Sequence, residues 1–160
     1  MFELTKNLMK RTNLLIALLL LAASSVFRKC GDTPPPPVSP QDAQLTKLSQ
    51  TWKATSVTFG GNPLPTPTGY ESFVLTASGT AGNPVFSYTT SGRPAKSPWP
   101  ASGTFEFGTD FATTIKRDDG IIVTYSVTAS QLQLTFNYTG SGFTARTGNV
   151  VGDWVFNFGL

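Results

Sequence analysis

Hydrophobic and polar residues alternate along most of the chain after Thr51. The clearest stretch is 131–138, where four apolar residues alternate with Gln, Gln, Thr and Asn. A period of two predicts a β-strand with one apolar and one wet face. The same pattern predicts strands at 52–59, 71–77, 85–89, 104–107, 112–117, 121–128 and 151–158.

Residues that favour turns separate these predicted strands. Asp119-Gly120 is the clearest hairpin signal, because glycine adopts a positive φ without strain at Cβ. A brief helix is predicted between Pro40 and Gln50, with Asp42 as its N-cap and with Leu45 and Leu48 on one face. Further turns are predicted at 60–63, 79–84, 108–110 and 140–148.

The predicted fold is all-β. Eight sequential strands with short connections favour a small antiparallel up-and-down β-barrel, which buries the apolar faces and leaves no exposed edges. A β-sandwich is the alternative. A segment of about 110 residues is long enough for one hydrophobic core, so we expect a single folded domain, and we expect it to be monomeric.

The first 29 residues differ in composition from the rest. Lys6, Lys10 and Arg11 precede the thirteen-residue apolar run 14–26. This order is typical of a secretory signal peptide, and the run is shorter than the roughly 20 residues of a membrane-spanning helix. The sequence therefore predicts an exported protein.

The net charge of +3 comes from this N-terminal segment. Residues 1–29 hold five of the twelve basic residues and one of the nine acidic residues, so the remainder carries seven basic and eight acidic residues. A nucleic-acid-binding domain needs its basic residues gathered on the folded part. We therefore expect no nucleic-acid partner.

Cys30 is the only cysteine, and it stands between the apolar run and a proline-rich tract. A lone cysteine in an exported chain is unusual, and acylation gives it a role. We expect Cys30 to be lipidated and to hold the protein in the cell envelope, at the outer membrane. The residues before it, Arg28 and Lys29, differ from the small residues usual at this position. Cleavage near 23–25, which would release a secreted or periplasmic soluble protein, is the alternative.

A proline-rich tract follows Cys30. Pro34 to Pro37 and Pro40 favour polyproline II, which extends by about 3.1 Å per residue and would hold the domain away from the membrane. The predicted organisation is a signal peptide at 1–29, an anchor and linker at 30–44, and a β domain at 45–160.

Four segments of the β domain carry a family resemblance: LTKLSQTWKATSV, WPASGTFEF, TTIKRDDGI and GDWVFNF. Their aromatic and turn residues are similar in spacing to those of lipocalin-like lipoproteins of Gram-negative bacteria. The resemblance spans about residues 45–160 and implies a barrel with Trp52 at one end. Lipocalins open with Gly-x-Trp, whereas Gln50 stands at the glycine position here. The resemblance further suggests Arg146 as the basic residue that covers Trp52.

One functional hypothesis is a binding module for a small apolar ligand. An eight-stranded barrel has an interior that side chains can fill or that can hold one ligand. The residues predicted to line it are Trp52, Phe73, Tyr125, Phe136 and Trp154. The alternative is that aromatic rings fill the core.

The second hypothesis is recognition of carbohydrate or protein in the envelope by aromatic residues on loops. Trp99 lies between Pro98 and Pro100, which restrict the backbone, and Tyr70 and Phe143 lie in loops that contain glycine. The alternative for Trp99 is that it packs inward over a barrel mouth.

The sequence contains few residues suited to catalysis or metal binding. The chain has no histidine, which excludes histidine-assisted triads and histidine zinc sites. Glu71, Glu106 and Asp153 are expected on outward strand positions, and Asp118 and Asp119 lack the further oxygen ligands of a calcium loop. We therefore expect no enzyme activity, no metal and no cofactor.

Overall fold

One helix and nine strands make up the part of the chain that the structure, a computed structural model, describes: residues 37–140 and 150–160. They are α2 (Pro40–Leu48), β1 (Thr51–Phe59), β2 (Asn62–Pro63), β3 (Val74–Ser78), β4 (Val85–Ser91), β5 (Ser102–Phe107), β6 (Thr114–Arg117), β7 (Ile122–Val127), β8 (Gln131–Tyr138) and β9 (Gly152–Gly159). Within this part, Val38–Leu160 forms one compact unit. It begins seven residues before the predicted β domain.

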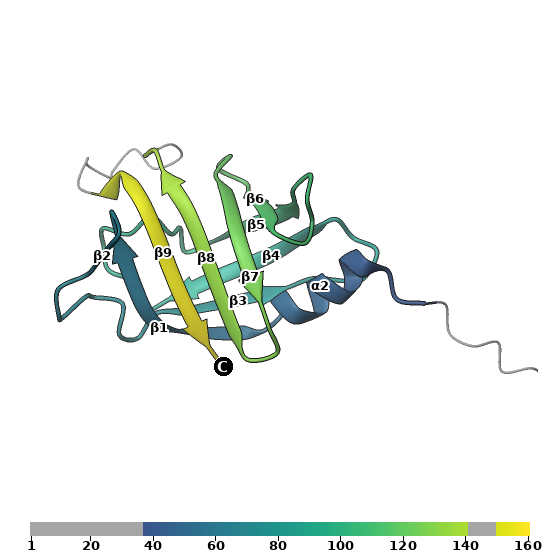
Figure 1. Ribbon diagram of the computed structural model, residues 1–160, viewed down its shortest axis with the longest axis horizontal. Coiled ribbons are helices and arrows are strands. Elements are labelled where there is room, and N and C mark those ends of the chain that lie inside the picture. The colour runs from purple at the N-terminus through teal and green to yellow at the C-terminus, as the bar shows by residue number, and fades with distance from the viewer. Residues whose placement is uncertain (1–36, 141–149) are drawn as a thin grey trace, which may run out of the picture. The chain divides into compact units, whose positions relative to one another are not determined.

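The strands close into an antiparallel barrel. Each of β3 to β8 pairs with the next strand along the chain, and β1 pairs with both β3 and β9, which completes the circle (Figure 1). The short strand β2 lies outside the circle and pairs only with the end of β1. The predicted eight-stranded up-and-down barrel is confirmed, and the sandwich alternative is wrong.

Alternation along the strands separates the core from the surface. In β8, buried and accessible residues alternate from Gln131 to Tyr138. The cross-strand pairs Leu132↔Phe158, Leu134↔Phe156 and Phe136↔Trp154 place apolar side chains of β8 and β9 in rows on the inner face. Burying each such side chain contributes about 1.5–3 kcal/mol to folding, so these rows are a main source of the barrel's stability.

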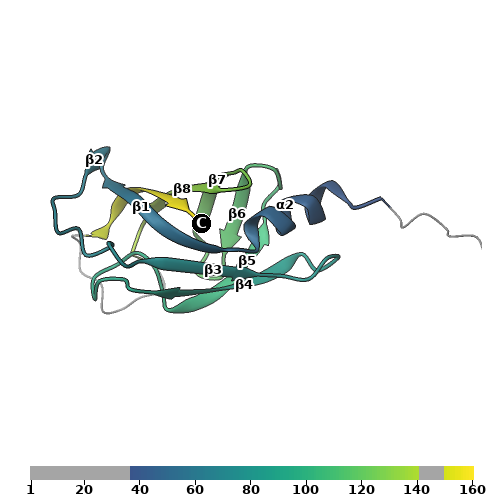
Figure 2. The same ribbon diagram turned by 90° about the horizontal axis from the view of Figure 1, so that it is seen from below.

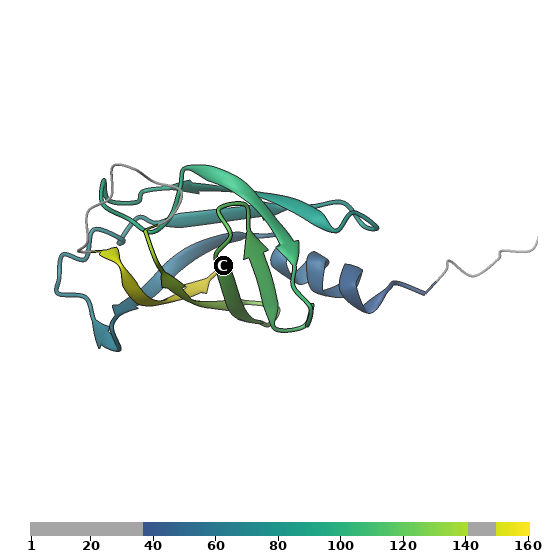
Figure 3. The ribbon, with the colours of Figure 1, turned by 90° about the horizontal axis from the view of Figure 1, so that it is seen from above.

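The helix α2 lies at one end of the barrel, away from β2 (Figure 1 and Figure 2), and the view from above shows it at the same end (Figure 3). Leu45 and Leu48 are buried, as their spacing predicted. The prediction of Asp42 as N-cap is wrong, because the Ser39 hydroxyl accepts the hydrogen bond from the Asp42 N–H. Asp42 Oδ1 instead accepts from the backbone N–H of Gly82, which joins the helix to the β3–β4 turn.

Two further segments differ from the prediction. Pro40, assigned to the extended linker, lies in the first turn of α2, where its missing N–H costs no helical hydrogen bond. Glu71, expected on a strand, lies in a turn, where its carboxylate accepts hydrogen bonds from the Thr68 N–H and hydroxyl. The strand therefore begins later, at Val74.

Candidate functional site

The barrel interior holds the five side chains predicted to line a ligand cavity. All five are at most 4% exposed. Four come from the adjacent strands β7, β8, β9 and β1, and Phe73 comes from the segment before β3. The Phe73 ring lies 5.6 Å from Phe156, and Phe136 stacks parallel to Phe156 at 6.0 Å. Trp154 stacks on the same Phe156 at 5.6 Å. Phe156 therefore packs against rings from its own strand, from β8 and from the segment before β3.

Trp99 lies in the middle of this packing. Its side chain is fully buried, and it contacts the rings of Phe73, Tyr88, Phe105, Phe136 and Phe156 at centroid distances of 5.4–6.3 Å. The interpretation of Trp99 as an exposed recognition residue is therefore wrong, and the inward-packing alternative holds.

Tyr70 is likewise buried, at 3% exposure, between Phe73, Trp154 and Phe156. Its predicted surface position is wrong for the same reason: a large ring gains more by packing than by remaining in water. Phe143, Arg146 and Cys30 lie outside the described residues.

A buried arginine is the interior residue that the sequence interpretation missed. The Arg117 side chain is fully covered, and its guanidinium lies 5.0 Å from the centre of the Trp99 ring and 5.5 Å from that of Phe136. Nη1 donates to the Pro98 carbonyl at 2.9 Å, and Nη2 pairs with Asp119 Oδ2 at 2.5 Å. A counter-charge, a carbonyl and two ring faces together replace the water that the cation loses.

The period-two pattern contained the signal for this residue. In β6, Ile115 and Arg117 are buried and the Lys116 between them is exposed, so Arg117 falls on the inner face. Asp119 lies in the hairpin turn, where Gly120 has a φ of +87° and donates its N–H to the Arg117 carbonyl. The predicted Asp119-Gly120 hairpin is confirmed, and the same turn supplies the carboxylate for the arginine.

Tyr88 closes one side of this cluster. Burial raises the pKa of its phenol well above the ordinary value, an effect that Asp118 and Asp119 reinforce and Arg117 opposes. Gly103 makes the arrangement possible, because a Cβ there would lie 2.6 Å from the Tyr88 hydroxyl and 2.7 Å from Asp118. Close packing around the buried charge stabilises this cluster.

The carboxylates considered for catalysis are spread over the outside. Glu106 pairs with Lys116 at 3.1 Å on the surface, and both side chains are about half exposed. Asp153 accepts a hydrogen bond from Asn137 on the outer face. Among residues 37–140 and 150–160, no group of three or more metal-binding side chains comes together.

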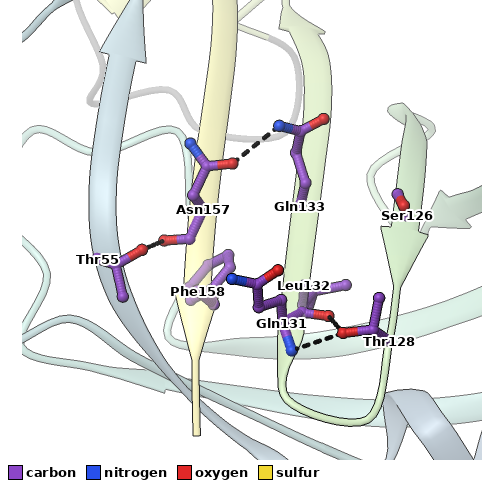
Figure 4. Close-up of a pocket in the computed structure, with 8 residues that line it drawn as sticks. All are labelled: Thr55, Ser126, Thr128, Gln131, Leu132, Gln133, Asn157 and Phe158. Carbon is purple, nitrogen blue, oxygen red and sulfur yellow. Dashed lines mark hydrogen bonds between the residues drawn. The ribbon is translucent and has the colours of Figure 1, made fainter.

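A hollow on the outer face of the barrel is lined by polar side chains (Figure 4). It crosses β1, β9, β8 and the end of β7, and its volume is about 340 Å³. The residues that line it are Thr55, Ser126, Thr128, Gln131, Leu132, Gln133, Asn157 and Phe158. Six of these residues carry hydroxyl or carboxamide groups, and none of the eight is charged. The other two, Leu132 and Phe158, have buried side chains that face the barrel interior.

Hydrogen bonds orient the amides of this hollow. Gln133 Nε2 donates to Asn157 Oδ1 at 2.8 Å, and Asn157 Nδ2 donates to the Ser56 hydroxyl at 2.9 Å. Thr55 lies at the irregularity between Ala54 and Ser56 in the β1–β9 pairing, and its hydroxyl donates to the Asn157 carbonyl. The outward side chains of three strands are thus held in one fixed arrangement.

Two smaller or more open hollows lie on the outer side of β3, β4, β5 and β6. One, of about 160 Å³, is lined by residues that include Glu106, Lys116 and Asp118, and the other, of about 380 Å³, lies over the β3–β4 turn. Glu106 and Lys116 satisfy each other's charge in the first.

The sequence matches no protein-family model, and comparisons with curated proteins and with solved structures also give no match. The lipocalin-like resemblance therefore rests on the sequence segments alone. None of the helices in the described part of the chain has the length and apolar character needed to cross a membrane.

Proposed function

We propose that this protein is an exported, lipid-anchored lipoprotein of the cell envelope whose non-catalytic barrel binds its partner on the outside. The anchor is Cys30, and the proline-rich tract separates it from the barrel. The observation that carries the choice of the outer surface is the filling of the interior by contacting aromatic rings.

Packing of the interior argues against a small apolar ligand there. A ligand would have to displace Trp99, which contacts five other rings, or the buried Arg117 that lies against it. Displacing a well-packed ring costs about 3–5 kcal/mol, judged by the cost of truncating one to alanine. An outer surface carries no such cost, because its side chains already face water.

Native mass spectrometry tests the location of the binding site. The protein is extracted gently from its own host, and its mass is measured before and after denaturation. We expect the polypeptide with its acyl groups and no further bound molecule. Release of an apolar molecule of a few hundred daltons would contradict the proposal and return the site to the barrel interior.

Acyl labelling tests the anchor separately. Cells are grown with an alkyne-bearing fatty acid, and the protein is compared with its Cys30→Ser variant. We expect label and membrane association in the unaltered protein and loss of both in the variant, with the labelled protein in the outer-membrane fraction. Unlabelled protein cleaved near 23–25 would favour the secreted or periplasmic alternative.

A further inference from the structure

We infer that the outer-face hollow around Gln131, Gln133 and Asn157 binds a neutral carbohydrate chain. This inference rests on the proposed function, because it names the ligand class of the barrel's outer surface. The hollow's volume of about 340 Å³ falls at the lower end of the range of small-molecule sites, about 300–1,000 Å³. It suits a segment of a polar chain that lies across the sheet.

The lining carries no charged side chain, which favours a neutral ligand. The eight described residues that form it include three carboxamides and three hydroxyls, and no acidic or basic side chain. A phosphate or carboxylate ligand would find no counter-charge there and would lose its hydration. An apolar ligand would cover the Gln131 amide and the Ser126 hydroxyl and leave both without a hydrogen-bond partner.

The lining groups match the chemistry of sugar hydroxyls. A carboxamide carries donors and an acceptor side by side, so it can bond two neighbouring hydroxyls of one ring, each of which both donates and accepts. Among the described residues, the Gln131 side-chain amide and the Ser126 hydroxyl make no hydrogen bond. Both are exposed and remain available to a ligand.

Part of the site is ordered before a ligand arrives. The bonds from Gln133 to Asn157 and from Asn157 to Ser56 hold two amides in place across three strands. Oriented side chains lose less conformational freedom on binding than free ones. The fixed amides define the direction of the chain, and the free Gln131 and Ser126 groups complete its hydrogen bonds.

A carbohydrate fits this face better than a peptide does. Peptides commonly bind sheets by adding a strand to an open edge, where main-chain groups are unpaired. The hollow lies where β1, β9, β8 and β7 pair with one another, so it offers side chains and no strand edge. Recognition there depends on side-chain amides and hydroxyls alone.

Saturation-transfer NMR tests the inference on the processed full-length protein, in a detergent without a sugar headgroup. The probes are cellohexaose, maltohexaose and chitohexaose. We expect transfer from the protein to at least one of them, with dissociation constants in the millimolar range. We further expect the signal to fall at least threefold in Gln131→Ala and in Gln133→Ala. Gln131 makes no side-chain hydrogen bond among the described residues, so its variant tests the site without disturbing the fold.

Asn137→Ala is the matched control. Asn137 lies on the same strand and donates to Asp153 of β9 as Gln133 donates to Asn157, but it does not line the hollow. Its variant should keep the full signal. Absence of transfer to all three sugars, or equal transfer in every variant, would overturn the inference. A neutral Ser/Thr-rich hexapeptide is measured alongside the sugars. Transfer to this peptide alone would overturn the inference in favour of a peptide partner. None of these outcomes changes the native mass expected for a filled barrel.

Discussion

The buried ion pair of Arg117 and Asp119 allows a direct test of how the barrel interior is stabilised. The guanidinium is fully covered, the Asp119 side chain is 8% exposed, and the two groups are 2.5 Å apart. Replacing Asp119 with alanine leaves a buried cation without its counter-charge. Replacing both residues removes the charge and the need to compensate it.

The cost of the single change follows from what remains around the cation. Loss of one partner of a buried pair costs about 3–5 kcal/mol. The Pro98 carbonyl and the faces of Trp99 and Phe136 still contact the guanidinium, and such ring contacts contribute about 0.5–2 kcal/mol each. We therefore expect Asp119→Ala to lower the free energy of unfolding by about 3 kcal/mol, at the lower end of that range.

The double variant Arg117→Met with Asp119→Ala should be more stable than Asp119→Ala alone and lie within about 1 kcal/mol of the unaltered protein, because an apolar side chain replaces the buried charge. Urea unfolding followed by tryptophan fluorescence measures both effects, since all three tryptophans are buried. With a slope of about 2 kcal/mol per molar urea, Asp119→Ala should lower the midpoint by about 1.5 M.

The control for this experiment is Asp153→Ala, which removes an exposed carboxylate from the outer face and should change stability by about 0.5 kcal/mol or less. A cost below about 1 kcal/mol for Asp119→Ala would refute the reasoning, because it would mean that the cation needs no counter-charge there. The reasoning would also fail if the double variant were no more stable than Asp119→Ala.

Three further predictions concern packing, pH and the helix. Gly103→Ala should lower the free energy of unfolding, measured by thermal unfolding, by about 1–3 kcal/mol, because the new Cβ would overlap the Tyr88 hydroxyl. The control Gly159→Ala meets only ordinary contacts and should be nearly neutral. Equal effects of the two substitutions would contradict the prediction. Burial raises the pKa of the Tyr125 phenol to about 12, whereas its pKa in the unfolded chain is about 10. The stability that the neutral phenol contributes is therefore complete below pH 10 and is lost as the pH rises through 12. Urea midpoints that stay unchanged between about pH 9 and 12 would contradict this prediction. Hydrogen bonds from Gly82 and Ser39 hold the pKa of the Asp42 carboxyl below its usual range. Asp42→Ala removes these bonds between the helix and its surroundings and should speed amide hydrogen exchange in α2. Protection equal to that of the unaltered protein would show that these bonds do not stabilise the helix.

Strand positions and side-chain orientation could be predicted from the sequence because they depend on neighbouring residues. Alternation at Leu132, Leu134 and Phe136 predicted which side chains face inward, and all three are buried. The predicted and observed strands agree in number around the barrel, although β3 begins later than predicted, at Val74. The N-cap was misassigned because Ser39 and Asp42 are both good caps, and the contact with Gly82 that occupies Asp42 comes from a turn forty residues away.

The sequence by itself determined the class of fold, the inward face of a regularly alternating strand such as β8, and the lack of histidine chemistry, because these follow from residue type and local period. Only the tertiary structure decided that β1 pairs with β9, that Trp99 packs inside and that Arg117 lies against it. It also brought Thr55 next to Asn157, 102 residues away, to form the outer hollow. Such contacts depend on strand register and on closure of the barrel, which join segments that no local pattern relates.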